Sequence, residues 1–174
     1  SNVRQILFAG GKWVGNYISP ELQVPEAHEA VLMQVGAYAR GHGHVAEEGI
    51  NCGIDYFVSG DEVIVTEINA RWTGGLFPAE FLRRLGITQP AVAFFDMVPV
   101  AQSGPVRTFQ REHLFPAAGD AFAYVPMGFT PFAMEIEGAE RYFVWQIVVG
   151  DFAAFVEAKR QALPEDAFPT AELI

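Results

Sequence analysis

The spacing of apolar residues along the chain predicts three helices. The first is expected to begin at Pro25 and to end at the glycines at positions 41 and 43, because apolar residues between them recur three and four positions apart. These apolar residues are Val31, Leu32, Val35, Tyr38 and Ala39. A shorter helix is expected over residues 78–85, before a glycine, and a last one over residues 152–163 with Asp151 as its N-cap.

Runs of β-branched and aromatic residues between Gly and Pro turns predict strands. Ile54–Val58 and Val63–Ile68 form a candidate hairpin, with Ser59-Gly60-Asp61-Glu62 as its turn. Further strands are expected at Gln5–Phe8, Lys12–Asn16, Val92–Phe95, Val106–Phe109, Phe122–Val125, Phe132–Ile136 and Tyr142–Val149. The pattern as a whole predicts an α+β fold, an antiparallel sheet with packed helices.

Composition limits the class of protein. The chain has 174 residues, of which 51% are hydrophobic and 18% charged, and this excludes an intrinsically disordered segment. The mean hydropathy of +0.18 is high, yet no apolar run reaches the ~20 residues of a membrane span. Asp96 and Gln146 interrupt the two longest runs. We therefore expect a broad core, or a face that meets another surface.

Charge and cysteine content narrow the class further. Lys and Arg number 11 against 21 Asp and Glu, giving a net charge of -10, which argues against nucleic-acid binding. The single cysteine, Cys52, offers neither an internal disulfide nor a metal cluster, and we expect a cytoplasmic protein. His42 and His44 fit a loop at a helix end, and the three tryptophans fit packing positions.

The hairpin carries the candidate chemistry. Glu67 and Asn69 share a face because alternate strand residues point the same way, and Arg71 would extend the row if the strand continued. We predict a register that places Asp55 opposite Glu67. The same register would pair Phe57 with Val65 and Ser59 with Val63, and would leave Ile54, Tyr56, Val58, Ile64, Thr66 and Ile68 on an apolar face.

Two facing carboxylates repel each other unless a proton or a cation lies between them. Oxygen ligands from Asp55, Glu67 and Asn69 are of the kind that Mg²⁺ prefers, and Arg71 could hold a phosphate or carboxylate oxygen beside them. The alternative is an exposed polar strand face with a local salt bridge to Arg71. Spacing alone leaves both readings open.

The two strands also resemble the metal-binding end of the ATP-grasp superfamily, in which an acidic residue on one strand is followed on the next by Glu-x-Asn-x-Arg. The matching segments are Gly53-Ile54-Asp55-Tyr56-Phe57-Val58 and Val63-Ile64-Val65-Thr66-Glu67-Ile68-Asn69-Ala70-Arg71. The resemblance implies that Asp55, Glu67 and Asn69 hold Mg²⁺ (or Mn²⁺) on the phosphates of ATP and that Arg71 is the catalytic arginine. It also implies that Thr73, Gly74 and Gly75 lie near phosphate and substrate.

The resemblance covers residues 3–87. Two later segments, Tyr124-Val125-Pro126-Met127-Gly128-Phe129 and Tyr142–Val149, resemble the C-terminal extension of peptide ligases of the pheganomycin type, and we expect residues 88–174 to form such an extension. The phosphate-binding lysine and the glycine-rich lid of such enzymes have no counterpart here. We therefore expect the C-terminal part of a carboxylate-amine ligase, inactive by itself, whose partners are a small carboxylate, an amine, the missing N-terminal lobes and a second copy of the chain. The alternative is a non-catalytic module for assembly or small-molecule binding that retains an ATP-grasp remnant.

Overall fold

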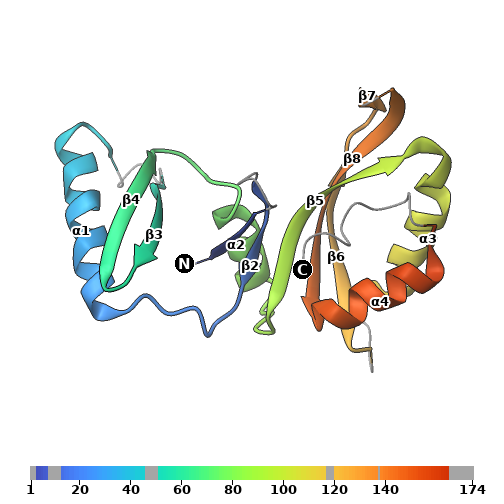
Figure 1. Ribbon diagram of the computed structural model, residues 1–174, viewed down its shortest axis with the longest axis horizontal. Coiled ribbons are helices and arrows are strands. Elements are labelled where there is room, and N and C mark those ends of the chain that lie inside the picture. Colours follow the sequence, from blue (N-terminus) through green and yellow to red (C-terminus); the bar gives the residue numbers. More distant parts are fainter. Residues whose placement is uncertain (1–2, 8–12, 46–50, 117–119, 137, 165–174) are drawn as a thin grey trace.

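The antiparallel strand pairing predicted from the sequence is distributed over two sheets (Figure 1). The computed structural model describes residues 3–7, 13–45, 51–116, 120–136 and 138–164. In this part of the chain, one sheet has six strands in the order β1-β2-β5-β8-β6, with β7 also paired to β8. The other sheet is the hairpin of β3 (Gly53–Ser59) and β4 (Glu62–Asn69). With four packed α-helices, the fold is α+β.

The larger sheet draws its strands from both ends of the sequence. Its strands are β1 (Arg4–Leu7), β2 (Trp13–Ile18), β5 (Ala91–Pro99), β6 (Phe122–Phe129), β7 (Met134–Ile136) and β8 (Ala139–Gly150). Strand β2 pairs with β5 from Gly15–Phe94 to Ile18–Ala91. This pairing joins the stretch before residue 87 to the stretch after it in one sheet.

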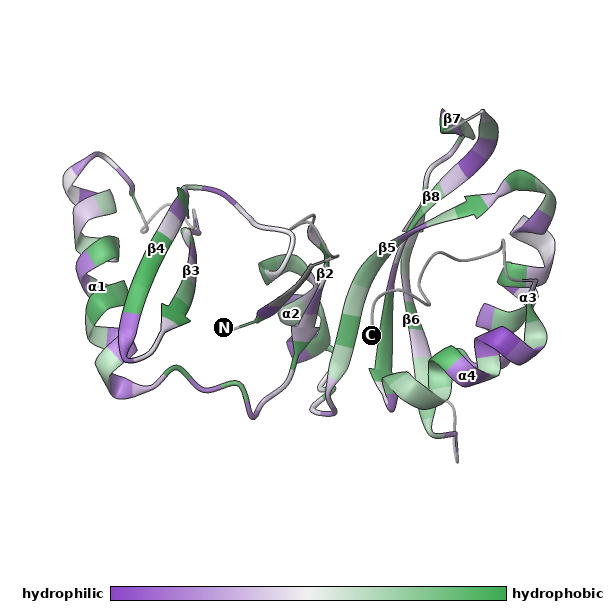
Figure 2. Ribbon diagram, in the orientation of Figure 1, coloured by the Kyte–Doolittle hydropathy of each residue, from purple (hydrophilic) through white to green (hydrophobic). Residues whose placement is uncertain are grey.

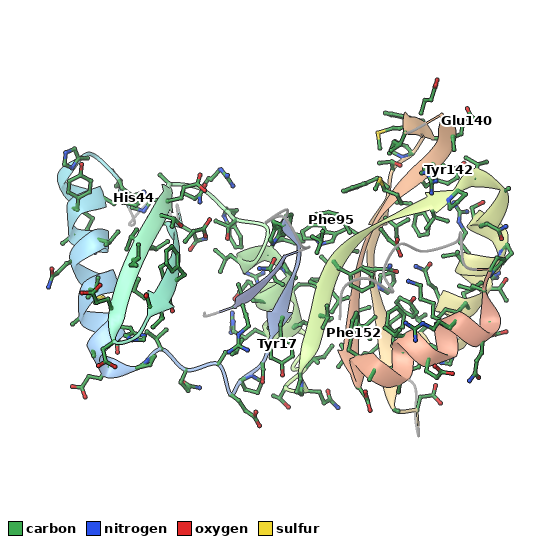
Figure 3. The ribbon with its side chains drawn as sticks, viewed as in Figure 1. Tyr17, His44, Phe95, Glu140, Tyr142 and Phe152 are labelled. Carbon is green, nitrogen blue, oxygen red and sulfur yellow. The ribbon has the colours of Figure 1, made fainter. Side chains whose placement is uncertain are left out.

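Helices cover the two faces of this sheet differently. Helix α3 (Ser103–Glu112) and α4 (Phe152–Ala162) cover one face through the buried side chains of Val106, Phe109, Phe155 and Val156. Helix α2 (Leu76–Arg84) packs Leu82 against the other face. Figure 2 shows hydrophobic residues along β5 and β8 between these layers. In Figure 3, Phe95 lies on the side of β5 toward β2, and Phe152 lies on the side toward α4, where it contacts Phe94.

The helix predictions are confirmed with small shifts at the ends. Helix α1 spans Glu26–Gly41, so Pro25 is the N-cap and not the first helical residue. Asp151 caps α4, since its Oδ1 accepts hydrogen bonds from the backbone N–H of Ala153 (2.9 Å) and Ala154 (3.0 Å). No helix within the described ranges is both long and apolar enough to cross a membrane.

One strand prediction is wrong, and a second is confirmed only in part. Residues 106–109 belong to α3, because Val106 and Phe109 are three positions apart and both reach the core from one helix face, with relative exposures of 0% and 4%. Of the strand expected over 132–136, only Met134–Ile136 pairs with β8. Phe132 is 66% exposed and lies outside the sheet. A short 3-10 helix, Val100–Gln102, leads into α3.

Candidate functional site

The predicted hairpin is present, and its two strands place the candidate ligands at the end away from the turn. Strand β3 spans Gly53–Ser59 and β4 spans Glu62–Asn69, joined by the two residues Gly60-Asp61. Gly60 has a φ of +62°, which glycine adopts without strain. Asp55 lies opposite Glu67, as the sequence predicts, and Gly53 lies opposite Asn69.

A β-bulge at Thr66 divides the hairpin into two registers. Asp55 pairs with Glu67 but Tyr56 pairs with Val65, so Thr66 is the extra residue of β4. The Thr66 hydroxyl donates a hydrogen bond of 3.0 Å to the carbonyl oxygen of Asp55. Toward the turn, the prediction is therefore wrong: Phe57 pairs with Ile64 instead of Val65, and Ser59 pairs with Glu62 instead of Val63.

The bulge also changes which side chains share a face. Ile64, opposite Phe57, lies on the face of Asp55 and not on the predicted apolar face. Phe57 is 53% exposed and Ile64 is 37% exposed. Val63 and Val65 take the positions opposite Val58 and Tyr56. The face with the two acids is thus polar at its open end, apolar in the middle at Phe57 and Ile64, and polar again at Ser59 and Glu62 beside the turn.

Asp55, Glu67 and Asn69 meet at the open end of the hairpin. Asn69 is 7% exposed, and its Nδ2 donates to Asp55 Oδ2 over 3.4 Å. Glu67 is exposed to solvent on the same face. The three side chains bring two carboxylates and one amide together, and an amide turned about its last side-chain bond would present its oxygen to the same point.

This donor set fits a hard divalent cation. Magnesium sites in proteins use one or two carboxylates and complete their octahedron with water and substrate oxygens. Among the described residues, no three His, Cys, Asp or Glu side chains gather as a metal site. The hairpin set reaches three oxygen-bearing ligand side chains only when the amide of Asn69 is counted with the two carboxylates.

Arg71 lies beside these groups but does not extend their strand row. Strand β4 ends at Asn69, and the backbone N–H of Arg71 donates to the carbonyl of Asn69 over 2.8 Å, which turns the chain. The guanidinium is exposed, and its Nη1 donates to the carbonyl of Trp72 over 3.3 Å. In the part of the chain that the structure describes, no carboxylate neutralises it.

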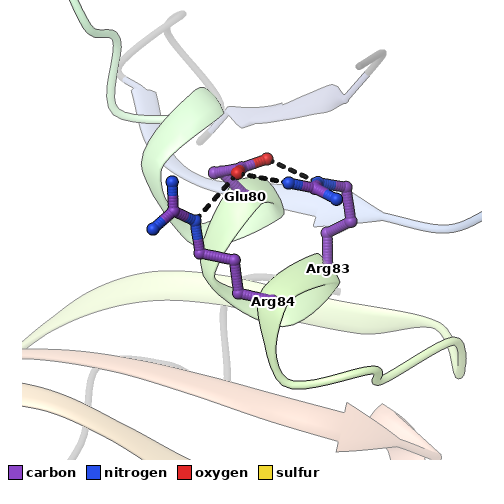
Figure 4. A network of polar contacts seen from close by, with 3 residues as sticks. All are labelled: Glu80, Arg83 and Arg84. Carbon is purple, nitrogen blue, oxygen red and sulfur yellow. Dashed lines mark hydrogen bonds and ion pairs between the residues drawn. The ribbon is translucent and has the colours of Figure 1, made fainter.

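Unlike Arg71, the two arginines of α2 have a carboxylate partner, Glu80, which Figure 4 shows between them. Arg83 binds both carboxylate oxygens of Glu80, over 2.7 and 2.6 Å, and Arg84 Nε binds one of them over 3.0 Å. These hydrogen bonds lower the pKa of Glu80 from 4.5 to about 2. Arg83 and Arg84 are thus engaged within α2, whereas Arg71 is available to an anionic ligand.

The loop after Arg71 packs tightly against the open end of the hairpin. The Thr73 hydroxyl accepts a hydrogen bond from the backbone N–H of Leu76 (3.3 Å) at the start of α2. A Cβ added at Gly53 would collide with the methyl group of Thr73. One added at Gly74 would lie 3.0 Å from the Trp13 ring, and one added at Gly75 would lie 2.6 Å from a methyl group of Val3. Small residues are needed here for packing, whatever else the loop binds.

A row of aromatic rings runs from this loop to the larger sheet. Trp72 contacts Phe77 at 6.5 Å between ring centroids, and Phe77 contacts Trp145 at 5.3 Å. Trp145 stacks on Phe95 at 5.2 Å, and Phe95 meets the edge of Trp13 at 5.3 Å. The three tryptophans therefore have packing partners, as the sequence indicates, and Trp72 connects the loop to β5 and β8.

A second polar group, which sequence reasoning missed, lies inside the larger sheet's core. Gln110 Nε2 donates to Gln146 Oε1 (2.9 Å), and Gln146 Nε2 donates to Asp96 Oδ2 (3.2 Å). Lys159 Nζ lies 3.5 Å from the same Asp96 oxygen. The signal was present in the sequence, because Asp96 and Gln146 interrupt two apolar runs that become neighbouring strands.

Burial shifts the pKa values of Lys159 and of Tyr124, both of which are influenced by the Asp96 carboxylate. Lys159 is 5% exposed. Burial lowers the pKa of Lys159 from 10.5 to about 7, although the nearby Asp96 carboxylate raises it. Burial, together with the Asp96 charge, raises the pKa of Tyr124 well above 10.0.

Comparison with protein-family models, curated proteins and solved structures finds no match. A function for this chain therefore has to be argued from its own residues.

Proposed function

We propose that the open end of the hairpin is the metal-binding part of an ATP-dependent carboxylate-amine ligase of the ATP-grasp type. The observation that carries the proposal is the placement of Asp55 directly opposite Glu67, with Asn69 3.4 Å from Asp55 on the same face. A strand face that serves only solubility has no need to set two carboxylates against each other.

Each side chain has a distinct role in this proposal. Asp55, Glu67 and Asn69 would hold Mg²⁺ (or Mn²⁺), which neutralises charge on the phosphates of ATP. Arg71, which is exposed and donates to the backbone carbonyl of Trp72, would bind the negative charge that develops on the acyl phosphate. The loop Thr73-Gly74-Gly75, pressed against Gly53, would bring backbone N–H groups close to the phosphates.

The proposed reaction has two steps. A substrate carboxylate attacks the γ-phosphorus of ATP, the bond to the bridging oxygen breaks, and ADP and an acyl phosphate are formed. The amine then attacks the acyl carbon, inorganic phosphate leaves, and the amine loses a proton as the amide forms. Arg71 would lower both barriers by pairing with oxygens whose negative charge increases.

A second candidate is a non-catalytic module for assembly or small-molecule binding. The exposed apolar residues on the hairpin favour it, since Phe57 on the acidic face and Val58 on the other are 53% and 45% exposed. Such a surface is typical of a contact with another lobe or with a second copy of the chain.

Metal binding by the chain itself distinguishes the two candidates. We expect Mn²⁺, followed by electron paramagnetic resonance, to bind one site, and Asp55→Asn or Glu67→Gln to weaken that binding at least about tenfold. Glu62→Gln is the matched control, because Glu62 is an exposed glutamate on the same strand at the turn end. Equal Mn²⁺ binding by Glu67→Gln and Glu62→Gln would contradict the metal site.

The catalytic roles need the complete ligase. There, Arg71→Ala and Glu67→Gln should abolish substrate-dependent release of ADP while circular dichroism shows an unchanged fold. Normal turnover by both variants would contradict the catalytic roles proposed for Arg71 and Glu67.

A further inference from the structure

Helix α2 covers only part of the sheet face against which it packs. On this face, Ala93 of β5 and Ile147 of β8 are 2% and 0% exposed and share a core cluster with α2. Two and four positions away along the same strands, and therefore on the same face, Phe95, Phe143 and Trp145 remain partly exposed. Among the described residues they belong to neither core cluster. Strands β5 and β8 lie inside the sheet, so this part of the face is an apolar surface that the chain leaves open.

A stack of aromatic rings lies on this open surface. Phe143 lies 4.7 Å from Phe95 and Phe95 lies 5.2 Å from Trp145, measured between ring centroids, with interplanar angles of 25° and 19°. Phe77, from the first turn of α2, continues the stack at 5.3 Å from Trp145. Phe77 is itself 45% exposed. Since ring contacts stabilise beyond the area that they bury, an added aromatic ring would gain from the same kind of contact.

The loop that carries Arg71 touches this ring stack in two places. Trp72, which is 48% exposed, meets Phe77 edge to face at 6.5 Å. A Cβ added at Gly74 would lie 3.0 Å from the ring of Trp13, whose own edge meets the stack at 5.3 Å. These two contacts hold the loop against the rings. Because Arg71 directly precedes Trp72, an anion bound at Arg71 has the exposed rings of Trp72 and then Phe77 beside it.

We propose that the acid substrate bound at this site carries an aromatic ring, which packs against Trp72 and Phe77. The inference rests on the function proposed above, which places the acid at Arg71, and it adds the class of acid. A small aliphatic acid would leave both rings in water, whereas an aromatic ring would cover them and make further ring contacts. Trp72 and Phe77 are specificity-determining residues in this proposal, since they select the body of the acid.

Saturation-transfer NMR on the full chain, without metal or nucleotide, tests the preference for a ring. The probes are N-acetylphenylalanine, N-acetylleucine and N-acetylalanine, which share one carboxylate and differ in the side chain. We expect the phenylalanine derivative to bind at least about tenfold more tightly than the alanine derivative and about threefold more tightly than the leucine derivative. Failure of the phenylalanine derivative to bind, or equal dissociation constants for it and the leucine derivative, would overturn the proposal.

Variants locate the ring and the carboxylate. Phe77→Ala and Trp72→Ala, both at exposed positions, should each reduce the preference for the phenylalanine derivative over the alanine derivative by about threefold or more. Phe132→Ala, which removes a phenylalanine that is 66% exposed and outside the stack, is the matched control and should keep the full preference. Equal preferences in Phe77→Ala and Phe132→Ala would refute the ring site. Arg71→Gln should remove the advantage of N-acetylphenylalanine over its neutral amide, and an advantage that survives would place the carboxylate elsewhere and overturn the proposal.

Metal binding and self-association, measured on the same protein, separate this inference from the function on which it rests. A Mn²⁺ site without any preference for a ring would overturn the class of acid and leave the metal site standing. A preference for a ring without Mn²⁺ binding would support the aromatic acid site and contradict the ligase function. Sedimentation velocity shows whether a second copy of the chain covers the rings instead. Self-association that Phe77→Ala abolishes and Phe132→Ala preserves would overturn the proposal.

Discussion

We expect the folding stability of the native chain to rise as the pH increases from 6 to 9, and we expect the replacement of Lys159 by methionine to remove this rise. Lys159 projects from α4 into the core, is 5% exposed and lies 3.5 Å from Asp96. Burial disfavours its charged form more than Asp96 favours it, so its pKa falls from 10.5 to about 7 in the folded state. The unfolded chain keeps the ordinary value.

The direction and the magnitude follow from proton linkage. Between pH values of about 7 and 10.5, the unfolded chain binds the lysine proton and the folded chain does not, so the free energy of unfolding increases with pH. Below that window both states are protonated, and the full penalty for burying the charge remains. With these two pKa values, the gain between pH 6 and pH 9 is on the order of 3 kcal/mol.

Urea denaturation followed by tryptophan fluorescence, repeated at each pH unit, measures this gain. The methionine variant keeps the length and apolar volume of the side chain. A plot of its free energy of unfolding against pH should therefore lack the part of the slope that Lys159 contributes. Arg160→Met is the matched control, because Arg160 is the exposed neighbour of Lys159 on α4 and has no burial penalty to relieve. If the native chain shows no gain in stability over this pH range, or if Lys159→Met keeps the native slope, the linkage argument is wrong.

Three further predictions concern stability and use the same urea assay. Gly15→Ala should lower it by about 1–3 kcal/mol, since the new Cβ would lie 2.9 Å from a β5 side chain, whereas Gly36→Ala, at an interior position of α1 with open space around it, should raise it by about 0.5–1 kcal/mol; the same sign for both would contradict the packing argument. Phe155→Ala, at 0% exposure, should cost about 3–5 kcal/mol, and Phe132→Ala, at 66% exposure, less than about 0.5 kcal/mol; similar losses would show that exposure does not decide the cost. Glu80, with its pKa lowered from 4.5 to about 2, stabilises the fold above pH 4.5 and loses this contribution as the pH falls toward 2; Glu80→Gln should lack that part of the acid transition, and an identical transition would refute the link.

The sequence predicts best where one pattern determines one structure. Helix α1 and the hairpin follow directly from apolar spacing and from a turn sequence, and both occur within a few residues of the predicted ends. Helix α3 was mistaken for a strand because the predicted segment, Val106-Arg107-Thr108-Phe109, is too short for its period to be assigned. In the structure, both residues belong to the same core cluster as residues of the larger sheet, so their spacing of three positions is helical.

The candidate site depends on information that the sequence carries only partly. The placement of Asp55 opposite Glu67 could be predicted because both acids must avoid the apolar face of the hairpin. The position of Arg71 could not, because whether β4 continues past Asn69 depends on a backbone hydrogen bond in the turn that follows. The buried group around Asp96 is a third case, since its members are far apart in sequence and only strand pairing brings them together.

The bulge at Thr66 explains how two incompatible registers coexist in one hairpin. A two-residue turn at Gly60-Asp61 sets Ser59 opposite Glu62. If that register continued, Asp55 would face Thr66, and Glu67 would point to the other side of the sheet. One extra residue in β4 restores the pairing of Asp55 with Glu67, and the Thr66 hydroxyl fixes the extra residue by donating to the Asp55 carbonyl. The short turn alone would separate the two acids, so the feature that brings them together is the bulge.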